Sequence, residues 1–526
     1  MSGPPNRLVE TLGTRLGSLS IEFNRAFWDS QVEATPDNET RRSEVEMELR
    51  RAKGDNEAFA AVTEALELEL HEPLLHRQLE SLRLWMTADQ MGETEREQIV
   101  ELSTAVESDF AHYRPIVDGE RLSDNQIEEI LRTSDDSDRR RRVWEASKEI
   151  GGIVSERVRE LARVRNKVAH DLGYADYYRM SLDLQELSEE WLFRRMDELE
   201  NLTEDAFLSW KKELDEGLMR RFSVDVLRPW HYADPFFQML PPDGVVTLDH
   251  LFEEIRAPSL AERTFKEWGI DLSGVMSASD LFPREKKSQH AFCLDVDRTG
   301  KDVRILANVV PGERWVEIML HESGHAAYDV AIDQRLPFLL RTAAHTFVTE
   351  AIAILSGRLV RDPNWLIGIA VIPKNEVERV APDLVRATRA QSLVFARWGL
   401  VMVHFERDLY SDPEADLDAR WWDLVERFQG VAPPPGRAAP DWAAKIHLST
   451  APIYYHNYLL GEMLASQLHA TCTRECGGLV GVAAAGQLLI DRIFKQGALM
   501  RWDALIEEAT GGPLSARDFA DYLSEA

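Results

Sequence analysis

The feature that most restricts the fold of this chain is the pattern His-Glu-Ser-Gly-His at residues 321–325. It has the form H-E-x-x-H, with the two histidines four residues apart. On an α-helix this spacing places His321 and His325 about 40° apart around the axis, so both imidazoles can reach one metal ion. Glu322 then lies about 100° from His321, where its carboxylate can hold a water molecule beside the metal. The pattern therefore predicts a helix with a metal site on one face.

The residues around this pattern favour a helix. Pro311-Gly312 opens the segment and Glu313 follows in the expected first turn, both of which are helix-start signals. The alternative is a surface helix that carries two unrelated histidines, and the helical period of the segment favours the metal site. Apolar residues recur on the face opposite the histidines, so that face can be buried. These residues are Val316, Met319, Leu320, Ala327, Val330 and Ala331.

Two histidines leave a catalytic zinc ion one protein ligand short, because such sites use three protein ligands and keep one open position. Glu350 is the first acidic residue on the next helical segment, which begins near Thr346. Asp329 and Asp333 are the alternatives, since they belong to the first helix or to its end. We favour Glu350 as the third ligand, because Asp329 is expected to face away from the two histidines.

Composition excludes several classes of partner. The chain has 526 residues, with 91 Asp and Glu against 61 Lys and Arg, and a net charge of -30. Such a charge disfavours nucleic acid and anionic membrane surfaces. The longest apolar run falls short of about 18 residues, so no membrane span is expected, and the N-terminal residues do not resemble a signal peptide.

Three cysteines indicate a reducing compartment, and we expect a cytoplasmic protein. Cys472 and Cys476 lie close in sequence to His469 on a probable helical segment. A second metal site at these residues is one interpretation. Buried or helix-end thiols are the other, and they are favoured because the spacing differs from that of a Cys-x-x-Cys site.

One region has the alternation of β-strands. Residues 290–296 and 303–309 flank Asp297-Arg-Thr-Gly300, which is a turn sequence. This hairpin directly precedes the H-E-x-x-H segment. We expect Ile305 to Asn308 to form an edge strand to which a peptide substrate adds as a further strand. The alternative is a hairpin that never contacts substrate.

Several motifs together resemble the gluzincin peptidases. His321-Glu322-Ser-Gly-His325, followed by Thr349-Glu350-Ala351-Ile352, is similar to the angiotensin-converting-enzyme family and to the thimet oligopeptidase/oligopeptidase F family. Lys445-x-His447 and Tyr455-x-x-Tyr458 resemble a later motif of the same families. The Taq-type carboxypeptidases share His-Glu-x-Gly-His-Ala, but their third-ligand motif differs from the sequence around Glu350.

The resemblance implies a mechanism. His321, His325 and Glu350 would hold one Zn²⁺ ion, and Glu322 would act as the base that activates water. His447 and Tyr458, or Tyr455 in its place, would donate hydrogen bonds to the oxyanion of the transition state. The converting-enzyme family carries an aspartate four residues after its third ligand, and that residue orients the first histidine. Ile354 occupies the position in this chain, so a different orienting group is expected.

The resemblance also implies a mostly α-helical, two-lobed body with a deep central channel. We expect lobes at residues 1–228 and 229–526 that together form one unit. A channel of this kind admits short peptides and excludes folded proteins. The expected function is a zinc metallopeptidase, specifically an oligopeptidase. A peptidyl-dipeptidase or carboxypeptidase of the same clan, an inactive peptide-binding relative and a hydrolase of non-peptide amides are the alternatives. Oligomeric state is left open.

Overall fold

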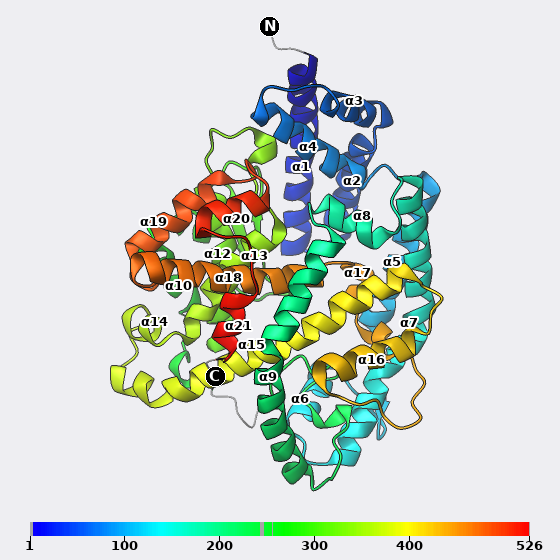
Figure 1. Ribbon diagram of the computed structural model, residues 1–526, viewed down its shortest axis with the longest axis vertical. Coiled ribbons are helices and arrows are strands. Elements are labelled where there is room, and N and C mark those ends of the chain that lie inside the picture. The colour runs from blue at the N-terminus through cyan, green and yellow to red at the C-terminus, as the bar shows by residue number, and fades with distance from the viewer. Residues whose placement is uncertain (1–3, 242–246, 255, 525–526) are drawn as a thin grey trace. The chain divides into compact units, whose positions relative to one another are not determined.

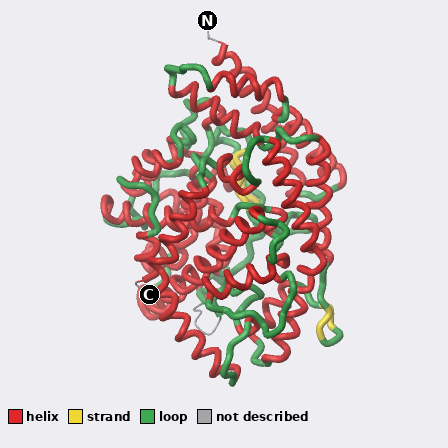
Figure 2. Tube along the Cα trace, turned by 45° about the vertical axis from the view of Figure 1, so that its right-hand side comes forward, coloured by secondary structure: helices red, strands yellow, loops and turns green. Residues whose placement is uncertain are grey.

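Helices account for nearly all of the regular structure. The computed structural model describes residues 4–241, 247–254 and 256–524. Within these residues the strands form two two-stranded sheets, β1–β2 and β3–β4, which are the yellow segments of Figure 2. The mostly α-helical fold expected from the sequence is thus confirmed. Among the described helices, none is both long enough and apolar enough to cross a membrane.

The chain folds into two compact units, each assembled from separate stretches of sequence. Unit 1 contains Met1–Gln90, Thr247–Ala381 and Leu460–Asp518. Unit 2 contains Met91–Val246, Pro382–Leu459 and Phe519–Ala526. The helices α15 (Lys374–Ser411), α18 (Tyr455–Cys476) and α21 (Arg517–Ser524) have residues in both units. The lobe boundary expected between residues 228 and 229 stays a prediction.

Unit 1 begins with four helices that build a core of their own, seen in blue in Figure 1. Val9, Leu12 and Leu16 recur at helical spacing on α1 and pack with Leu79 and Leu82 of α4. The remaining elements of unit 1 surround the H-E-x-x-H helix or follow it. The elements that lie wholly in unit 1 are α1 (Pro4–Val32), α2 (Pro36–Lys53), α3 (Asn56–Leu66), α4 (Pro73–Thr87), α10 (Ala257–Glu267), α11 (Ser273–Ala278), β3 (Phe292–Asp295), β4 (Val303–Leu306), α12 (Glu313–Ala331), α13 (Thr346–Gly357), α14 (Pro363–Gly368), α19 (Ala483–Arg492) and α20 (Trp502–Thr510).

Unit 2 is built on long helices with buried aromatic residues between them. Trp144 and Tyr178 are fully buried side chains in this unit, as are Trp398 and Trp421. A few short 3₁₀ turns, such as Pro229–His231, connect the helices. The elements that lie wholly in unit 2 are α5 (Glu93–His112), β1 (Ile116–Val117), β2 (Glu120–Arg121), α6 (Asp124–Thr133), α7 (Ser137–Asp171), α8 (Tyr177–Leu184), α9 (Glu189–Phe222), α16 (Leu417–Gln429) and α17 (His447–Thr450).

The hairpin expected before the H-E-x-x-H segment is present as β3 and β4, but the expected edge strand is wrong. In β4, Ile305 pairs with Cys293 of β3 on one side. On the other side, the N–H of Asp280 donates to the carbonyl of Ile305, and the N–H of Ala307 donates to the carbonyl of Asp280. Both edges of residues 305–307 are therefore occupied. Among the described residues of this sheet, β3 is the strand whose outer side has no β-bridge partner.

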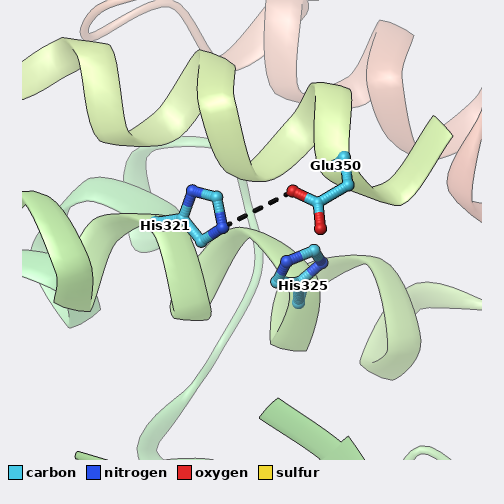
Figure 3. Close-up of side chains that lie close together, drawn as sticks. All are labelled: His321, His325 and Glu350. Carbon is cyan, nitrogen blue, oxygen red and sulfur yellow. Dashed lines mark ion pairs between the residues drawn. The ribbon is translucent and has the colours of Figure 1, made fainter. Parts of the chain in front are cut away.

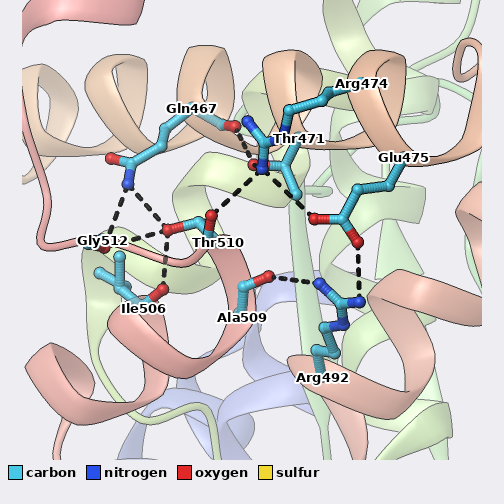
Figure 4. A network of polar contacts seen from close by, with 9 residues as sticks. All are labelled: Gln467, Thr471, Arg474, Glu475, Arg492, Ile506, Ala509, Thr510 and Gly512. Atoms are coloured by element: carbon cyan, nitrogen blue, oxygen red, sulfur yellow. Dashed lines mark hydrogen bonds and ion pairs between the residues drawn. The ribbon is translucent and has the colours of Figure 1, made fainter.

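A polar network fastens α18 to α20 within unit 1 (Figure 4). Gln467 Nε2 donates to Thr510 Oγ1 at 2.8 Å, and Arg474 donates to the carbonyl of Thr510 at 3.2 Å. Arg492 reaches both Glu475 and the carbonyl of Ala509. Gln467 is buried, and a buried side-chain amide needs such partners, because leaving it unpaired costs free energy. The network therefore fixes the later half of α18, whose first turn carries the predicted catalytic tyrosines.

Candidate active site

The H-E-x-x-H pattern lies on α12, as expected. The start of that helix is held by a residue distant in sequence. Gly312 has φ 129°, a conformation that favours glycine. The N–H of Glu313 donates to Asp249 Oδ1 at 2.9 Å, which satisfies one of the free N–H groups of the first turn. From this start, about two to three helical turns bring His321, Glu322 and His325 to the middle of α12.

Close packing of α12 against α13 brings the third ligand into place. A Cβ atom added to Gly324 would lie 2.8 Å from Ala353 Cα, nearer than real Cβ contacts allow. Only glycine therefore permits this approach of the two backbones. A Cβ atom on Gly461 of α18 would similarly lie 3.3 Å from Glu350 Cβ, so α18 packs tightly against the other side of α13. Glu350 is held between the two helices.

The structure brings His321, His325 and Glu350 together (Figure 3). One potential ligand atom from each lies within 4.8 Å of the others, and no other such group occurs in the part of the chain that the structure describes. His321 Nε2 lies 3.7 Å from Glu350 Oε2. Ligands of one tetrahedral zinc ion lie roughly 3 to 3.5 Å apart, given bonds of about 2.0 to 2.2 Å. The separations in the structure are somewhat longer than this, and two imidazoles with one carboxylate are ligand types that Zn²⁺ binds.

Electrostatics favours the protonation states that a metal needs. Burial lowers the pKa of His321 to about 4. Burial, and secondarily the neighbouring His321, lowers the pKa of His325 to about 3. Both imidazoles are therefore neutral at pH 7, the form that binds metal. The His321 side chain is 32% exposed, so the site can be reached from solvent.

Glu322 is positioned by the edge strand. Burial, together with the nearby Glu350, raises the pKa of Glu322 to about 8, whereas a hydrogen bond from the N–H of Cys293 opposes that shift. This hydrogen bond ties the carboxylate to β3. A carboxylate whose pKa lies near the working pH is suited to take up and release a proton. A bound cation beside the two carboxylates would lower the pKa again.

The two histidines differ in their supporting contacts. His325 Nδ1 lies 2.7 Å from Thr349 Oγ1, the residue before Glu350 on α13. Such a contact fixes the orientation of a metal-ligating ring. Within the described residues, no hydrogen bond is made to Nδ1 of His321. Ile354 stands at the position where the related family carries an aspartate, and it packs against Gly461 instead. A Cβ atom added to Gly461 would lie 3.1 Å from Ile354 Cδ1.

The other predicted site residues form a second cluster, in unit 2. We term residues 445–458 the tyrosine loop. The ring of His447 lies 5.3 Å from that of Tyr455, and the rings of Tyr455 and Tyr458 are 5.5 Å apart. Tyr455 accepts a hydrogen bond from Trp398 Nε1 at 3.2 Å. Burial lowers the pKa of His447 to about 4, so its ring is neutral at pH 7.

The alternatives to these residues do not form metal sites. Asp329 is outside the metal-ligand group, and burial, with the nearby Asp295, raises its pKa to about 8. Among the described residues, Cys472, Cys476 and His469 do not form a metal-ligating group either. Cys472 is buried, and burial raises the pKa of its thiol to about 12, as expected for a structural cysteine.

Sequence patterns missed three features that position the site: the Thr349 contact with His325, the Cys293 contact with Glu322 and the glycine at 324. Thr349 and Gly324 were visible inside the quoted motifs, but their roles depend on which way α12 and α13 face each other. The Cys293 contact depends on which strand forms the sheet edge. Both are properties of tertiary packing, which periodicity does not report.

Comparison with known proteins agrees with this geometry. The family model described as angiotensin-converting enzyme, Peptidase_M2, matches residues 5–209 and 284–524. The chain belongs to this family. Both matched segments contain parts of unit 1 and unit 2. The metal cluster of His321, Glu322, His325 and Glu350 and the tyrosine loop lie within the second segment.

Individual relatives in the family are distant. An angiotensin-converting enzyme of Theromyzon tessulatum is 24% identical over 237 residues, which is 42% of this chain and 38% of that protein. The enzyme of Mesocricetus auratus is 22% identical over 432 residues, or 72% of this chain and 32% of that protein. The enzyme of Oryctolagus cuniculus is 25% identical over 245 residues, which is 43% of this chain and 18% of that protein. The matched regions thus span less than two fifths of these relatives.

Proposed function

We propose that this protein is a zinc-dependent metallopeptidase that hydrolyses short peptides. The observation that carries the proposal is the group formed by His321, His325 and Glu350, with Glu322 beside it on α12. Two neutral imidazoles and a carboxylate form the donor set of a catalytic zinc ion with one open position. Membership in the angiotensin-converting-enzyme family supports the same function.

Glu322 is the proposed general base. When bound, the ion supplies Lewis-acid chemistry, acidifying water and polarising the carbonyl group of the scissile peptide. Glu322 accepts a proton from the attacking water, and it then delivers that proton to the leaving nitrogen. The N–H of Cys293 keeps its carboxylate turned toward the sheet edge during both steps. We propose that the peptide backbone adds to β3, because Asp280 occupies the outer side of β4, whereas β3 has no strand on its outer side among the described residues.

His447 and Tyr458 are the proposed donors to the oxyanion. A tyrosine hydroxyl and a neutral imidazole N–H can each donate one hydrogen bond to developing negative charge. The Nδ1 atom of His447 is buried and has no hydrogen-bond partner among the described residues, so its hydrogen-bonding capacity is unused in this structure. Tyr455 is the alternative donor, because its hydroxyl accepts from Trp398 Nε1 and its own O–H can still donate.

A peptidyl-dipeptidase is the specific activity that one observation favours. Lys445 donates to Gln238 Oε1 at 2.9 Å and lies over the rings of Trp398 and Tyr455. An ammonium group has three donors, so Lys445 can still bind a carboxylate. Burial lowers its pKa to about 8, which leaves it mostly charged at pH 7. A cation two residues from His447 is suited to the terminal carboxylate of a substrate.

The test uses a library of quenched peptides, with and without a chelator, and mass analysis of the products. We expect chelator-sensitive cleavage and about one zinc ion per chain. Release of C-terminal dipeptides, abolished when the peptide carries a C-terminal amide, would support the peptidyl-dipeptidase. Internal cleavage that ignores the amide would support an oligopeptidase. Zinc without peptide hydrolysis would point to an inactive relative or to a hydrolase of other amides, and absence of zinc would contradict the proposal.

Three free cysteines, Cys293, Cys472 and Cys476, support the further proposal of a reducing, cytoplasmic location. Short peptides are the proposed partners, and the acidic charge of the chain argues against nucleic acid.

A further inference from the structure

The tyrosine loop contains an unusual backbone conformation. Ile453 has φ 56°, in the left-handed region. A β-branched residue there is a genuine outlier, because its side chain crowds the backbone. Val371 is the other β-branched residue with positive φ among those described, but it is 62% exposed, whereas Ile453 is 2% exposed. A conformation of this kind persists only when the surroundings impose it.

Glu406 of α15 contacts the backbone of Ile453 directly. Its Oε1 atom accepts a hydrogen bond from the N–H of Ile453 at 2.7 Å. Glu406 is 2% exposed, and burial raises its pKa to about 8, opposed by the Ile453 N–H and by Arg165. Without this acceptor the N–H of Ile453 would be buried and unpaired, which is costly. A buried acidic group placed on one strained peptide is therefore a specific restraint.

Two further buried groups hold the loop on either side of Ile453. Arg165 of α7 donates to the carbonyl of Ser449 at 2.8 Å and to the hydroxyl of Tyr410 at 3.0 Å. Asn457 Nδ2 donates to Gln185 Oε1 at 3.1 Å. The loop between His447 and Tyr458 is thus fixed before, at and after the strained residue, and all of these contacts lie within unit 2.

We propose that Glu406 is a positioning residue for catalysis. By holding Ile453 in the left-handed conformation, Glu406 sets the direction in which α18 begins. That direction in turn sets the orientation of Tyr458 relative to His447. This inference rests on the proposed function, because it assigns those two side chains to the oxyanion. Backbone strain concentrates where a fixed geometry serves function. A displacement of about 1 Å in a catalytic group can cost roughly 100-fold in rate.

The test compares Glu406→Ala with Glu406→Gln in the full chain loaded with zinc. The alanine variant should lower kcat by roughly 10- to 100-fold, with KM and zinc content nearly unchanged. Glutamine keeps a carbonyl acceptor at the same place, so Glu406→Gln should stay within about threefold of the original protein. Asp408→Ala is the matched control, since Asp408 lies two residues further along α15 and pairs with Arg420. Its kcat should not change.

A second pair of variants tests whether Glu406 acts through Ile453. Glycine adopts positive φ without strain. In the Ile453→Gly background, the loss of kcat from Glu406→Ala should therefore shrink to about threefold or less. This background also protects the test if Glu406→Ala alone fails to fold. Circular dichroism and thermal unfolding report whether each variant is folded.

Several outcomes overturn the inference. These are a Glu406→Ala variant within twofold of the original protein, a Glu406→Gln variant as slow as the alanine variant, or an equal loss in both Ile453 backgrounds. Failure of both alanine variants to fold would assign Glu406 to stability alone and also overturn it. Absence of zinc-dependent hydrolysis in the unmutated protein is a different result, because it removes the proposed function itself.

Discussion

The metal cluster and the tyrosine loop reach fixed geometry by different physical routes. In the metal cluster, two ligands come from adjacent turns of one helix, and the third comes from the next helix along the chain. In the tyrosine loop, His447 and Tyr458 are separated by a strained turn, which is held by side chains up to 284 residues away in sequence. Local helical spacing therefore suffices for the metal cluster, whereas long-range buried hydrogen bonds are needed for the tyrosine loop.

Among the variants that separate the metal cluster from the tyrosine loop, removal of a metal ligand should have the largest effect on zinc content and activity. Glu350→Ala leaves two histidines, which are too few for a catalytic zinc site. We expect zinc content well below one ion per chain and activity reduced by at least roughly 1000-fold, with the helices intact. Metal analysis and peptide turnover measure both effects. Glu462→Ala is the control, because Glu462 pairs with Arg358 and is not one of the proposed ligands. This variant should keep its zinc. Full zinc content in Glu350→Ala would contradict the ligand assignment.

Variants of the tyrosine loop should separate its role from that of the metal cluster. Tyr458→Phe removes one proposed hydrogen bond to the oxyanion, which costs roughly 100-fold in kcat in comparable sites. Zinc content should remain at one ion per chain. Tyr113→Phe, which removes a hydroxyl bonded to the carbonyl of Ala146, is the matched control. Equal kcat for Tyr458→Phe and Tyr113→Phe would move the donor role to Tyr455 or His447.

A smaller effect is expected where the metal cluster depends on packing between helices. Thr349→Val keeps the shape of the side chain but removes its contact with His325 Nδ1. Loss of such a supporting group typically costs roughly 10- to 100-fold in metal affinity or activity. Competition with a chelator of known affinity measures the zinc affinity. Unchanged zinc affinity and turnover would mean that helix geometry alone orients His325.

A last effect is expected on stability without metal rather than on turnover. The pKa of Glu322 is about 8 in the folded chain, above its usual value of 4.5. The folded state then keeps a proton that the unfolded chain has released, so this contribution to stability is complete below about pH 4.5 and is lost as the pH rises through about 8. The glutamine in Glu322→Gln cannot titrate. With metal removed from both proteins by a chelator, the free energy of unfolding of the variant should therefore rise relative to that of the original protein, by up to roughly 1 kcal/mol per pH unit between pH 5 and 8.

Thermal unfolding across that pH range checks this expectation. A stability difference that stays constant with pH would show that the pKa of Glu322 is not raised. Subtracting the two proteins removes the contributions of other buried acids such as Asp329 and Glu406, because both proteins share them.

Sequence patterns predicted the metal cluster well because its chemistry repeats with the helical period. The H-E-x-x-H spacing places two ligands on one face, and Glu350 lies on the next helix with an acidic side chain. Helix bounds were also close: α13 begins at Thr346 as expected, and the side chain of His345 caps it. The mostly α-helical fold was implied by the family resemblance, and it is confirmed.

The remaining features depend on contacts between residues distant in sequence. The edge strand was assigned to residues 305–308, but Asp280 occupies the outer side of β4. Nothing in the local pattern around Ile305 reveals that partner. In the same way, Glu406 reads as one of many helical acids, and only the fold shows its contact with Ile453. The missing aspartate at Ile354 was visible in the sequence, but its structural consequence for His321 was not.

The central claim is that Glu322 activates water beside a zinc ion held by His321, His325 and Glu350. Peptide turnover by Glu322→Gln, measured on protein with its zinc content determined in the same sample, tests it most directly. We predict one zinc ion per chain and a kcat at least roughly 1000-fold below that of the original protein. A zinc-loaded Glu322→Gln protein with kcat within tenfold of the original would contradict the claim.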